Sequence, residues 1–213
     1  MILGIDEAGR GCLCGALFVA GVACTKELAA FFNKQGLKES KQLKREKRFE
    51  FAQKIKEHPE ILSLVVAKSA LEIDHKGLSV CMQEAIAQIV LQFPHILHVQ
   101  LDGNTLFHLQ FSHLRCFEPI IKGDCQITQI AMASILAKAA KDKEMLALDK
   151  AYPAYGFIRH CGYGTQEHRK AIAHLGYLKE HRKSFKLKPF VDRNQNREDI
   201  NKDEQSSMPN GRH

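Results

Sequence analysis

The stretch ILGIDEAGRGCLCG, residues 2–15, decides the fold of this chain. Its opening ILGI is apolar and predicts a buried strand, and two adjacent carboxylates, Asp6 and Glu7, follow directly. Successive side chains of a strand point to opposite faces, so the two acids can serve one site only if the strand stops or bends there. Gly9 and Gly11 permit such a bend. The stretch therefore predicts a core strand that delivers paired acids to a turn.

The acid pair favours a divalent metal site. Two carboxylates held close together repel each other at neutral pH, and the adjacent sequence offers one base, Arg10. Mg²⁺ or Mn²⁺ would relieve the repulsion, because both are hard cations that prefer oxygen ligands. A solvated turn is the alternative, and it is the commoner setting of an isolated Asp-Glu pair. The apolar strand in front of Asp6 and Glu7 argues against it.

Two more aspartates are candidates for the same site. HILHVQLDG, residues 95–103, predicts a strand that closes on Asp102, and carboxylates at neighbouring strand ends of an α/β sheet converge at one edge. Asp124 precedes a long predicted helix, where it is either the N-cap of that helix or a fourth acid of the site. Four acids around divalent ions fit two-metal phosphodiester chemistry.

Strands alternate with amphipathic helices along the chain, which indicates an α/β fold. The region after residue 151 is helical and basic in pattern, and we expect Gly176 to end a helix there. We predict a core over residues 1–150, a small helical appendage over 151–190 and a polar, disordered tail over 191–213. The predicted strands span residues 1–5, 16–24, 62–67, 95–103 and 116–121. The segment 34–57 is predicted to be a loop followed by a helix, and two further core helices are predicted over 72–93 and 126–148.

The composition of the chain limits its cellular compartment and the kind of molecule that it binds. The formal charge of +7 and pI near 9.0 favour a polyanion, with nucleic acid ahead of an anionic membrane surface. No run approaches the ~20 apolar residues of a membrane span, and charges interrupt the first apolar stretch before a signal peptide could form. The 7 cysteines make no CxxC pair, which favours buried thiols in a reducing compartment. We therefore expect a cytoplasmic protein that does not enter a membrane, and a monomer.

The Gly9-Arg10-Gly11 turn also suits recognition of a nucleic acid. Glycine lets another backbone approach closely, and its exposed N–H and C=O groups can bond a 2′-hydroxyl, the group that distinguishes RNA from DNA. Arg10 would meet a phosphate. The alternative is a plain tight turn. Tyr163, between two glycines, is either a stacking platform for nucleic acid or a loop aromatic that covers the core.

At this point the sequence resembles bacterial ribonuclease HII, the type 2 ribonuclease H. The shared motifs occur in the order of that family and extend over about residues 1–187. They are DEAGRG (6–11), ESKQL (39–43), LDGN (101–104), KGD (122–124), IAMASILAKAAKD (130–142), GYGTQEH (162–168) and HRKSF (181–185).

The resemblance implies a ribonuclease H-like mixed sheet flanked by helices. It implies a Mn²⁺- or Mg²⁺-dependent endonuclease that hydrolyses the RNA of RNA–DNA hybrids and incises duplex DNA 5′ to embedded ribonucleotides, leaving 3′-hydroxyl and 5′-phosphate ends. Carried over residue by residue, the family's metal-binding and catalytic acids are Asp6, Glu7, Asp102 and Asp124. Its 2′-hydroxyl sensor corresponds to Gly9, Arg10 and Gly11, its stacking tyrosine to Tyr163, and its phosphate contacts to Ser40 and Lys41.

The chain departs from the family pattern at a few positions. Cys12 and Ala16 stand where prolines are usual, so we expect a looser connection after the turn. Glu39 and Gln42 replace an aspartate and a lysine, which affects only the details of phosphate contact. None of these changes touches the four acids.

Two other functions compete with the nuclease hypothesis. The first is a binding module without catalytic activity that keeps the fold and uses the cation structurally, although all four acids are retained. The second is a DNA-directed nuclease of the same superfamily, such as a junction resolvase. His160, His168 and His181 could assist proton transfer, but eleven histidines are scattered along the chain and we assign none a catalytic role.

Overall fold

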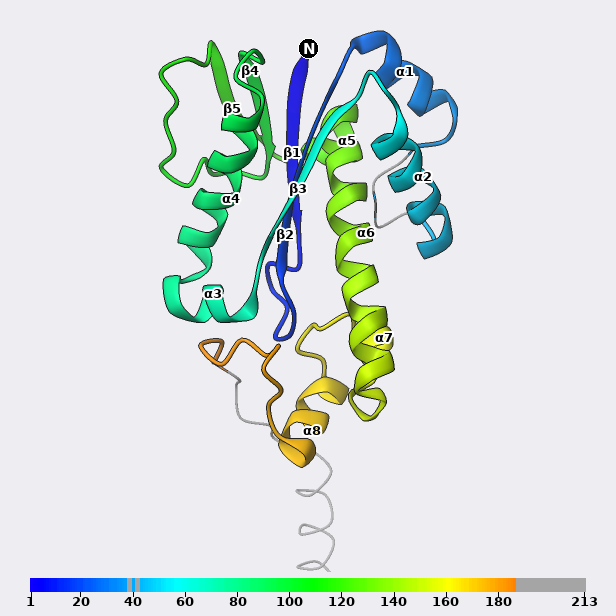
Figure 1. Ribbon diagram of the computed structural model, residues 1–213, viewed down its shortest axis with the longest axis vertical. Coiled ribbons are helices and arrows are strands. Elements are labelled where there is room, and N and C mark those ends of the chain that lie inside the picture. Colours follow the sequence, from blue (N-terminus) through cyan, green and yellow to red (C-terminus); the bar gives the residue numbers. More distant parts are fainter. Residues whose placement is uncertain (38–39, 41–42, 187–213) are drawn as a thin grey trace, which may run out of the picture.

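A computed structural model describes residues 1–37, 40 and 43–186. Its centre is a five-stranded mixed sheet in the order β3-β2-β1-β4-β5 (Figure 1). The central strand β1 pairs with β2 antiparallel and with β4 parallel; β2 also pairs antiparallel with β3, and β4 parallel with β5. The predicted mixed α/β sheet is confirmed. The strands are β1 (Ile2–Ala8), β2 (Leu17–Cys24), β3 (Leu62–Lys68), β4 (His98–Asp102) and β5 (Cys116–Ile120).

Helices cover both faces of the sheet. On one face the core joins α1 (Lys26–Lys34), α2 (Arg45–Glu57) and α6 (Thr128–Ala151) to the sheet. On the other face α3 (Ala70–Lys76) and α4 (Leu78–Gln92) pack against the sheet. Figure 1 shows these two groups of helices on opposite sides of β1. Successive side chains of β1 point to opposite faces of the sheet, as in any strand. Leu3 and Ile5 therefore lie in the core on the α4 side, and Ala8 lies in the core on the α6 side.

The packing of β1 on α6 depends on Gly4. A Cβ atom at Gly4 would lie 2.4 Å from the carbonyl carbon of Gln129 and 2.4 Å from the amide nitrogen of Ile130. Both atoms belong to the backbone of α6, so no side-chain rotation could relieve the overlap. Glycine at this position lets the helix lie directly on the strand, and Asp6, two residues further along the same face, is thereby brought beside α6.

Several predicted elements have different boundaries in the structure. Helix α1 was not predicted, although Thr25 caps it by accepting a hydrogen bond from the amide of Leu28 at 3.3 Å. The helix predicted over 72–93 is two helices, because Gly77 adopts a φ of 84° between α3 and α4. Part of the loop predicted before α2 and the whole predicted tail lie outside the described residues.

Asp124 does not cap the long helix. It lies within a separate short helix, α5 (Gly123–Gln126), whose N-cap is Lys122 in a left-handed conformation. The N-cap of α6 is Ile127, which gives no side-chain cap. The capping interpretation of Asp124 is therefore wrong, since an extra turn of helix separates it from α6.

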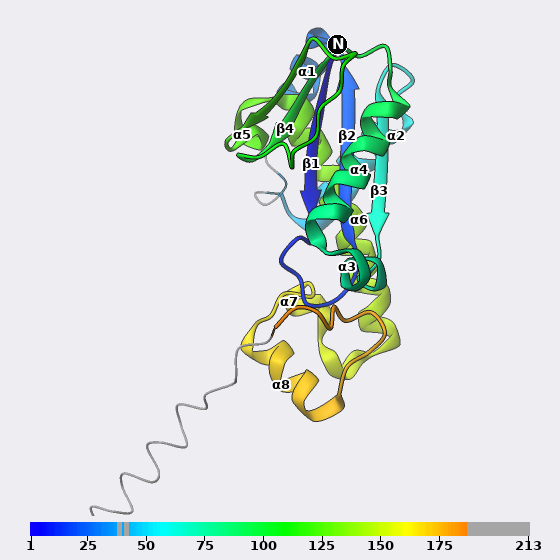
Figure 2. The ribbon, with the colours of Figure 1, turned by 90° about the vertical axis from the view of Figure 1, so that its left-hand side faces the viewer.

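The region after α6 is less helical than expected. It contains η2 (Pro153–Tyr155), α7 (Phe157–His160) and α8 (Gln166–Leu175), and Gly176 ends α8 as predicted. Residues 176–186 form no helix. Their backbone pairs with the loop between β1 and β2 instead: the amide of Gly15 donates to the carbonyl of Glu180, and that of Arg182 to the carbonyl of Leu13, both at 2.8 Å. Figure 2 shows this segment beside the loop.

No helix among the described residues is long and apolar enough to cross a membrane.

Replacing Gly4 with Ala tests the close contact between β1 and α6. The added methyl group overlaps backbone on both sides, so we expect a loss of stability at or above the upper end of the about 1–3 kcal/mol typical of overpacked cores. Gly36→Ala is the control, because no atom lies within 4 Å of a Cβ there and only its φ of 86° opposes the change. Denaturant unfolding measures both; an equal or smaller loss for Gly4→Ala would contradict the proposed role of this contact.

Candidate active site

A cavity of about 390 Å³ opens at the edge of the sheet where β1 and β4 end. It collects side chains from β1, the following turn, β4, α5, α6 and the segment after α7. All four candidate acids line it, together with the turn and Tyr163. The complete lining is Asp6, Glu7, Ala8, Gly9, Arg10, Gly11, Ser40, Asp102, Asp124, Ser134, Lys138 and Tyr163.

Asp6 and Glu7 reach this cavity without a break in the strand. The pair was predicted at the end of a strand, but β1 continues through both acids to Ala8. Its pairing with β4 ends earlier, at Ile5 opposite Leu101, whereas its pairing with β2 continues. One edge of β1 is therefore free of strand pairing beside both acids and opens into the cavity. The bend follows at Gly9, which adopts a φ of 86°.

Asp102 and Asp124 come together because β4 and α5 meet. Asp102 is the last residue of β4, and its Oδ1 accepts hydrogen bonds from the amides of Gly123 at 2.7 Å and Asp124 at 3.4 Å. These bonds fix the start of α5 to the end of β4. Asp124 is 9% exposed, and its position in the cavity is a consequence of this junction.

The electrostatics of the pair favour a cation. Burial, the charge of Glu7 and the charge of Asp102 raise the pKa of Asp6 well above its usual value, although hydrogen bonding to Ser134 lowers it in part. Burial also raises the pKa of Glu7, while Arg10, whose guanidinium lies 3.6 Å from the Glu7 carboxylate, lowers it. Deprotonated acids at this edge therefore repel one another in a poorly solvated place, and a divalent cation would stabilise them.

The donor set fits Mg²⁺ or Mn²⁺, because every candidate ligand is a carboxylate oxygen. Within the described part of the chain, however, no group of three or more His, Cys, Asp or Glu side chains is already arranged to hold a metal ion. The four acids share a cavity without a finished coordination shell. The four acids line one cavity, as the sequence predicted. Metal binding by them stays a prediction.

Polar residues of α6 form the wall opposite β1. Ser134 and Lys138, one helical turn apart, both line the cavity. The Ser134 hydroxyl lies 2.8 Å from that of Ser40, which also lines the cavity, and the phosphate contact of Ser40 stays a prediction. Neither Ser134 nor Lys138 was among the predicted site residues, although both lie in the motif at 130–142. The available signal was their polar character at i and i+4 on a helical face that is otherwise apolar, with Ile130, Ala131 and Ile135 beside them.

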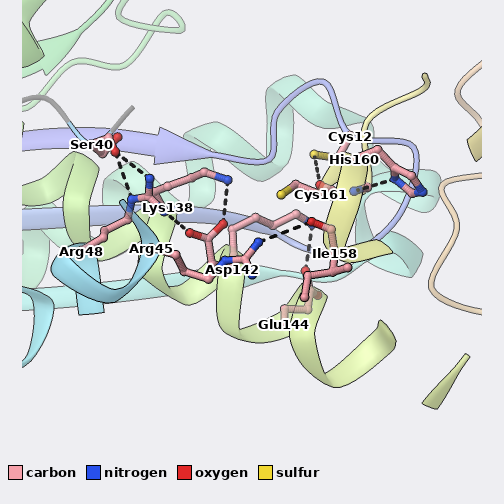
Figure 3. Close-up of polar contacts among 12 residues, drawn as sticks. Cys12, Ser40, Arg45, Arg48, Lys138, Asp142, Glu144, Ile158, His160 and Cys161 are labelled. Atoms are coloured by element: carbon pink, nitrogen blue, oxygen red, sulfur yellow. Dashed lines mark hydrogen bonds and ion pairs between the residues drawn. The ribbon is translucent and has the colours of Figure 1, made fainter. Parts of the chain in front are cut away.

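A buried arginine holds the segment that carries Ser40. Arg48 donates to the carbonyls of Ser40 at 2.7 and 3.0 Å and of Leu43 at 2.8 Å, and it pairs with Asp142 (Figure 3). Lys138 donates to the same Asp142 carboxylate at 2.7 Å. The network therefore links α2, α6 and the Ser40 segment. Lys41, the second predicted phosphate contact, lies outside the described residues.

The turn of Gly9, Arg10 and Gly11 is braced from beneath. The fully buried Arg182 donates to the carbonyl of Arg10 at 2.9 Å and to that of Gly15 at 3.0 Å. Lys141 donates to the carbonyls of Cys14 and Ala16 at 3.0 and 3.1 Å. Two buried cations therefore hold the carbonyls of the loop in which the usual prolines are missing.

Tyr163 lies beside the turn. Its backbone forms an isolated antiparallel bridge with Cys12, and the Cys12 thiol donates to the carbonyl of Cys161 at 3.3 Å (Figure 3). The Tyr163 side chain is 46% exposed and lines the cavity. It does not cover the core, so the stacking interpretation is the one that the position of the ring supports.

The three histidines considered in the sequence analysis lie behind Tyr163, away from the four acids. Desolvation lowers the pKa of His168 and of His181 to about 4. Both side chains are buried, with 0% and 1% exposure. Imidazoles this deep are neutral at physiological pH and lie outside the cavity lining, so they have no place in the proton transfers at the four acids.

Acid titration tests the burial of these imidazoles. Their folded pKa of about 4 lies below the ordinary 6.5, so the unfolded chain binds more protons between those values and stability falls as the pH is lowered through this window. Each imidazole contributes on the order of 3 kcal/mol across the window. Comparing the free energy of unfolding of wild type and His168→Leu from pH 7 to 4 should show a shallower loss for the variant; parallel curves would contradict this origin.

The fold and the site together define a class of enzyme. A mixed sheet with acids on its central strand and on the parallel neighbour, and a long helix packed over them, is the architecture of the ribonuclease H-like metal-dependent hydrolases.

Comparisons with known proteins identify the family. The family model Ribonuclease HII matches residues 3–188. Ribonuclease HII of Helicobacter pylori (strain J99 / ATCC 700824) is 52% identical over 189 residues, which cover 88% of this chain and 90% of that protein. Ribonuclease HII of Campylobacter concisus (strain 13826) is 39% identical, with 88% and 94% covered. The chain belongs to the ribonuclease HII family and is a metal-dependent ribonuclease H that acts on RNA–DNA hybrids.

Solved structures agree on the fold. A structure of the PCNA:RNase HII complex from Archaeoglobus fulgidus matches with a TM-score of 0.74 at 27% identity, covering 91% of this chain and 99% of that one. A structure of Bst-RNase HIII in complex with Mn²⁺ matches with a TM-score of 0.61 at 18% identity, covering 82% and 70%. The second likeness supports the fold alone.

Proposed function

We propose that this chain also incises duplex DNA 5′ to embedded ribonucleotides, and that it does so by a two-metal mechanism that leaves 3′-hydroxyl and 5′-phosphate ends. The observation that carries the proposal is the composition of one cavity, which places four acids beside a glycine-rich turn and an exposed tyrosine. The acids suit metal-assisted hydrolysis, and the turn and the tyrosine suit recognition of a sugar. Such incision would begin the removal of ribonucleotides from replicated DNA.

Asp6, Glu7, Asp102 and Asp124 are the residues that would hold the ions, Mn²⁺ or Mg²⁺. When bound, two such ions would activate water and stabilise the leaving oxygen. Asp6 is the most buried of the four acids at 5% exposure, and the Glu7 amide donates to its Oδ1 at 2.6 Å. This bond orients the Asp6 carboxylate and is compatible with its deprotonated form.

The turn and Tyr163 would recognise the junction between ribonucleotide and deoxyribonucleotide. The backbone groups of Gly9, Arg10 and Gly11 would bond the 2′-hydroxyl, and the ring of Tyr163 would stack on the sugar at the junction. Ser40 and Lys41 would contact phosphate, and Lys138, on the cavity wall, adds a positive charge at the same edge.

Residues 1–150 would carry the chemistry and residues 151–190 the contacts to the substrate duplex. We further propose that the protein acts as a monomer in the cytoplasm. The absence of a membrane-spanning helix among the described residues is compatible with this setting.

The first test of the mechanism replaces Asp6 with Asn. Losing the charge removes a metal ligand while the side chain keeps its size, so we expect cleavage of a duplex with a single ribonucleotide to fall by roughly 10²-fold or more, with binding to an RNA–DNA hybrid largely intact. Glu57→Gln, at the exposed end of α2, is the matched control. Assays with and without Mn²⁺ measure the rates; wild-type turnover in the variant would remove Asp6 from the mechanism.

An all-DNA duplex in the same assay discriminates the competing functions. A sensor of the 2′-hydroxyl leaves it uncut, whereas a junction resolvase or another DNA-directed nuclease acts on suitable all-DNA substrates. A binding module without catalytic activity cuts neither substrate at any metal concentration.

A second test concerns Tyr163. Replacing it with Ala removes the stacking platform, which is worth about 1–3 kcal/mol per base or roughly tenfold in affinity for the ribonucleotide-containing duplex. Phe31→Ala is the control, because Phe31 has a similar exposure of 50% but does not line the cavity. Fluorescence anisotropy with Ca²⁺ in place of the catalytic metal measures both affinities. Equal losses for the two variants would show that Tyr163 makes no special contact.

A further inference from the structure

Behind Tyr163 lies a buried group of three histidines that the mechanism does not use. His160, His168 and His181 have exposures of 6%, 0% and 1%. The rings of His160 and His168 stack with centroids 4.3 Å apart, and the rings of Phe157 and Tyr155 surround the group. A buried polar ring is stable only when its nitrogens are hydrogen-bonded, so the partners of each nitrogen define what the group does.

The hydrogen bonds of two of these rings run in one direction. The amide of Leu178 donates to Nδ1 of His181 at 2.8 Å, so the proton of a neutral His181 ring is on Nε2. Nε2 of His181 lies 3.1 Å from Nε2 of His168, which must then accept. The proton of His168 is therefore on Nδ1, which lies 2.9 Å from the carbonyl oxygen of Tyr163. The chain begins at an amide after α8 and ends on Tyr163.

The end of this chain fixes the backbone on both sides of the Tyr163 ring. The amide of Tyr163 donates to the carbonyl of His160 at 2.9 Å. Its carbonyl accepts from the amide of Thr165 at 2.8 Å as well as from His168. With both backbone groups held, the exposed ring keeps a defined position over the cavity, and stacking on a sugar requires such a position.

Simple core packing does not explain this arrangement. Phe157 already supplies an aromatic contact to His168, with centroids 5.4 Å apart at an interplanar angle of 80°. An apolar ring at position 168 could fill the same space, but it would leave the Tyr163 carbonyl without its side-chain donor and Nε2 of His181 without an acceptor. The hydrogen bonds require an imidazole, or a group that imitates one of its nitrogens.

We propose that His168 is a positioning residue for ribonucleotide recognition: its Nδ1–H holds the carbonyl of Tyr163, and His181 supports it by fixing the ring tautomer. This inference rests on the proposed role of Tyr163 at the junction. His168 touches neither substrate nor metal, and it acts through the placement of the tyrosine ring.

Two amide substitutions separate the two nitrogens of His168. The side-chain nitrogen of Asn can take the place of Nδ1 and keep the donor to Tyr163, whereas that of Gln reaches toward the place of Nε2 and leaves the Tyr163 carbonyl without it. For cleavage of a duplex with one ribonucleotide, we expect His168→Asn to stay within about threefold of wild type in kcat/KM and His168→Gln to lose roughly tenfold or more, since small misplacements of a positioning group are costly. Thermal unfolding of both variants checks that they fold.

A double-substitution cycle gives a readout that a purely structural role would not move. If His168 acts through the tyrosine, His168→Gln has little further effect on kcat/KM once Tyr163 is replaced by Ala. Additive losses, or equal losses for His168→Asn and His168→Gln, would overturn the proposal. If His168→Gln does not fold, His181→Asn replaces it in the cycle. The side chain of that variant can still accept from the Leu178 amide but is too short to reach His168. Additive losses in that second cycle would also overturn the proposal.

The failure of this inference is distinguishable from failure of the proposed function. If Tyr163→Ala itself leaves kcat/KM and affinity at wild-type values, the role of the tyrosine at the junction is wrong. If Tyr163→Ala lowers them and the His168 variants behave alike, only the positioning role is wrong.

Discussion

The direct contact between β1 and α6 is the constraint on which the site depends. Gly4 leaves no side chain between the strand and the helix, so their backbones touch at Gln129 and Ile130. With the two elements this close, Asp6 on the strand lies beside Ser134 on the helix, and Lys138 follows one turn later. Any residue larger than glycine would push the helix away and separate the acids of the sheet from the polar residues of α6.

That close packing also creates the electrostatic character of the cavity. It removes water from Asp6, and the neighbouring Glu7 and Asp102 add repulsion, so the pKa of Asp6 is raised. Ionising these acids in the folded chain costs more free energy than ionising them in water, and a bound cation would offset this cost.

The second half of the site depends on polar contacts between distant parts of the chain. Arg182 holds the carbonyls of Arg10 and Gly15, and a short bridge joins Cys12 to Tyr163. Through these contacts the turn at Gly9 to Gly11 and Tyr163, about 150 residues apart in sequence, become one unit. The buried histidines extend the same unit to the last described segment.

Much of this was predictable because its signals are local. Apolar runs and helical spacing gave the strands and most helices, and the chemistry of a carboxylate pair after an apolar run pointed to a metal. Glycines at positions 9 and 11 predicted the turn. The helix α1 could also have been found, since Thr25 is a recognisable cap.

Other features depend on partners that no local pattern reveals. The sequence by itself determined an α/β fold, the acids and the basic character of the chain, because periodicity and side-chain chemistry are properties of single segments. Only the tertiary structure decided that β1 runs on past both acids, that Ser134 and Lys138 face them, and that Arg182 and His168 brace the turn and the tyrosine. Each of these depends on where one segment meets another, and burial and hydrogen bonding across that distance are set by packing rather than by neighbours in sequence.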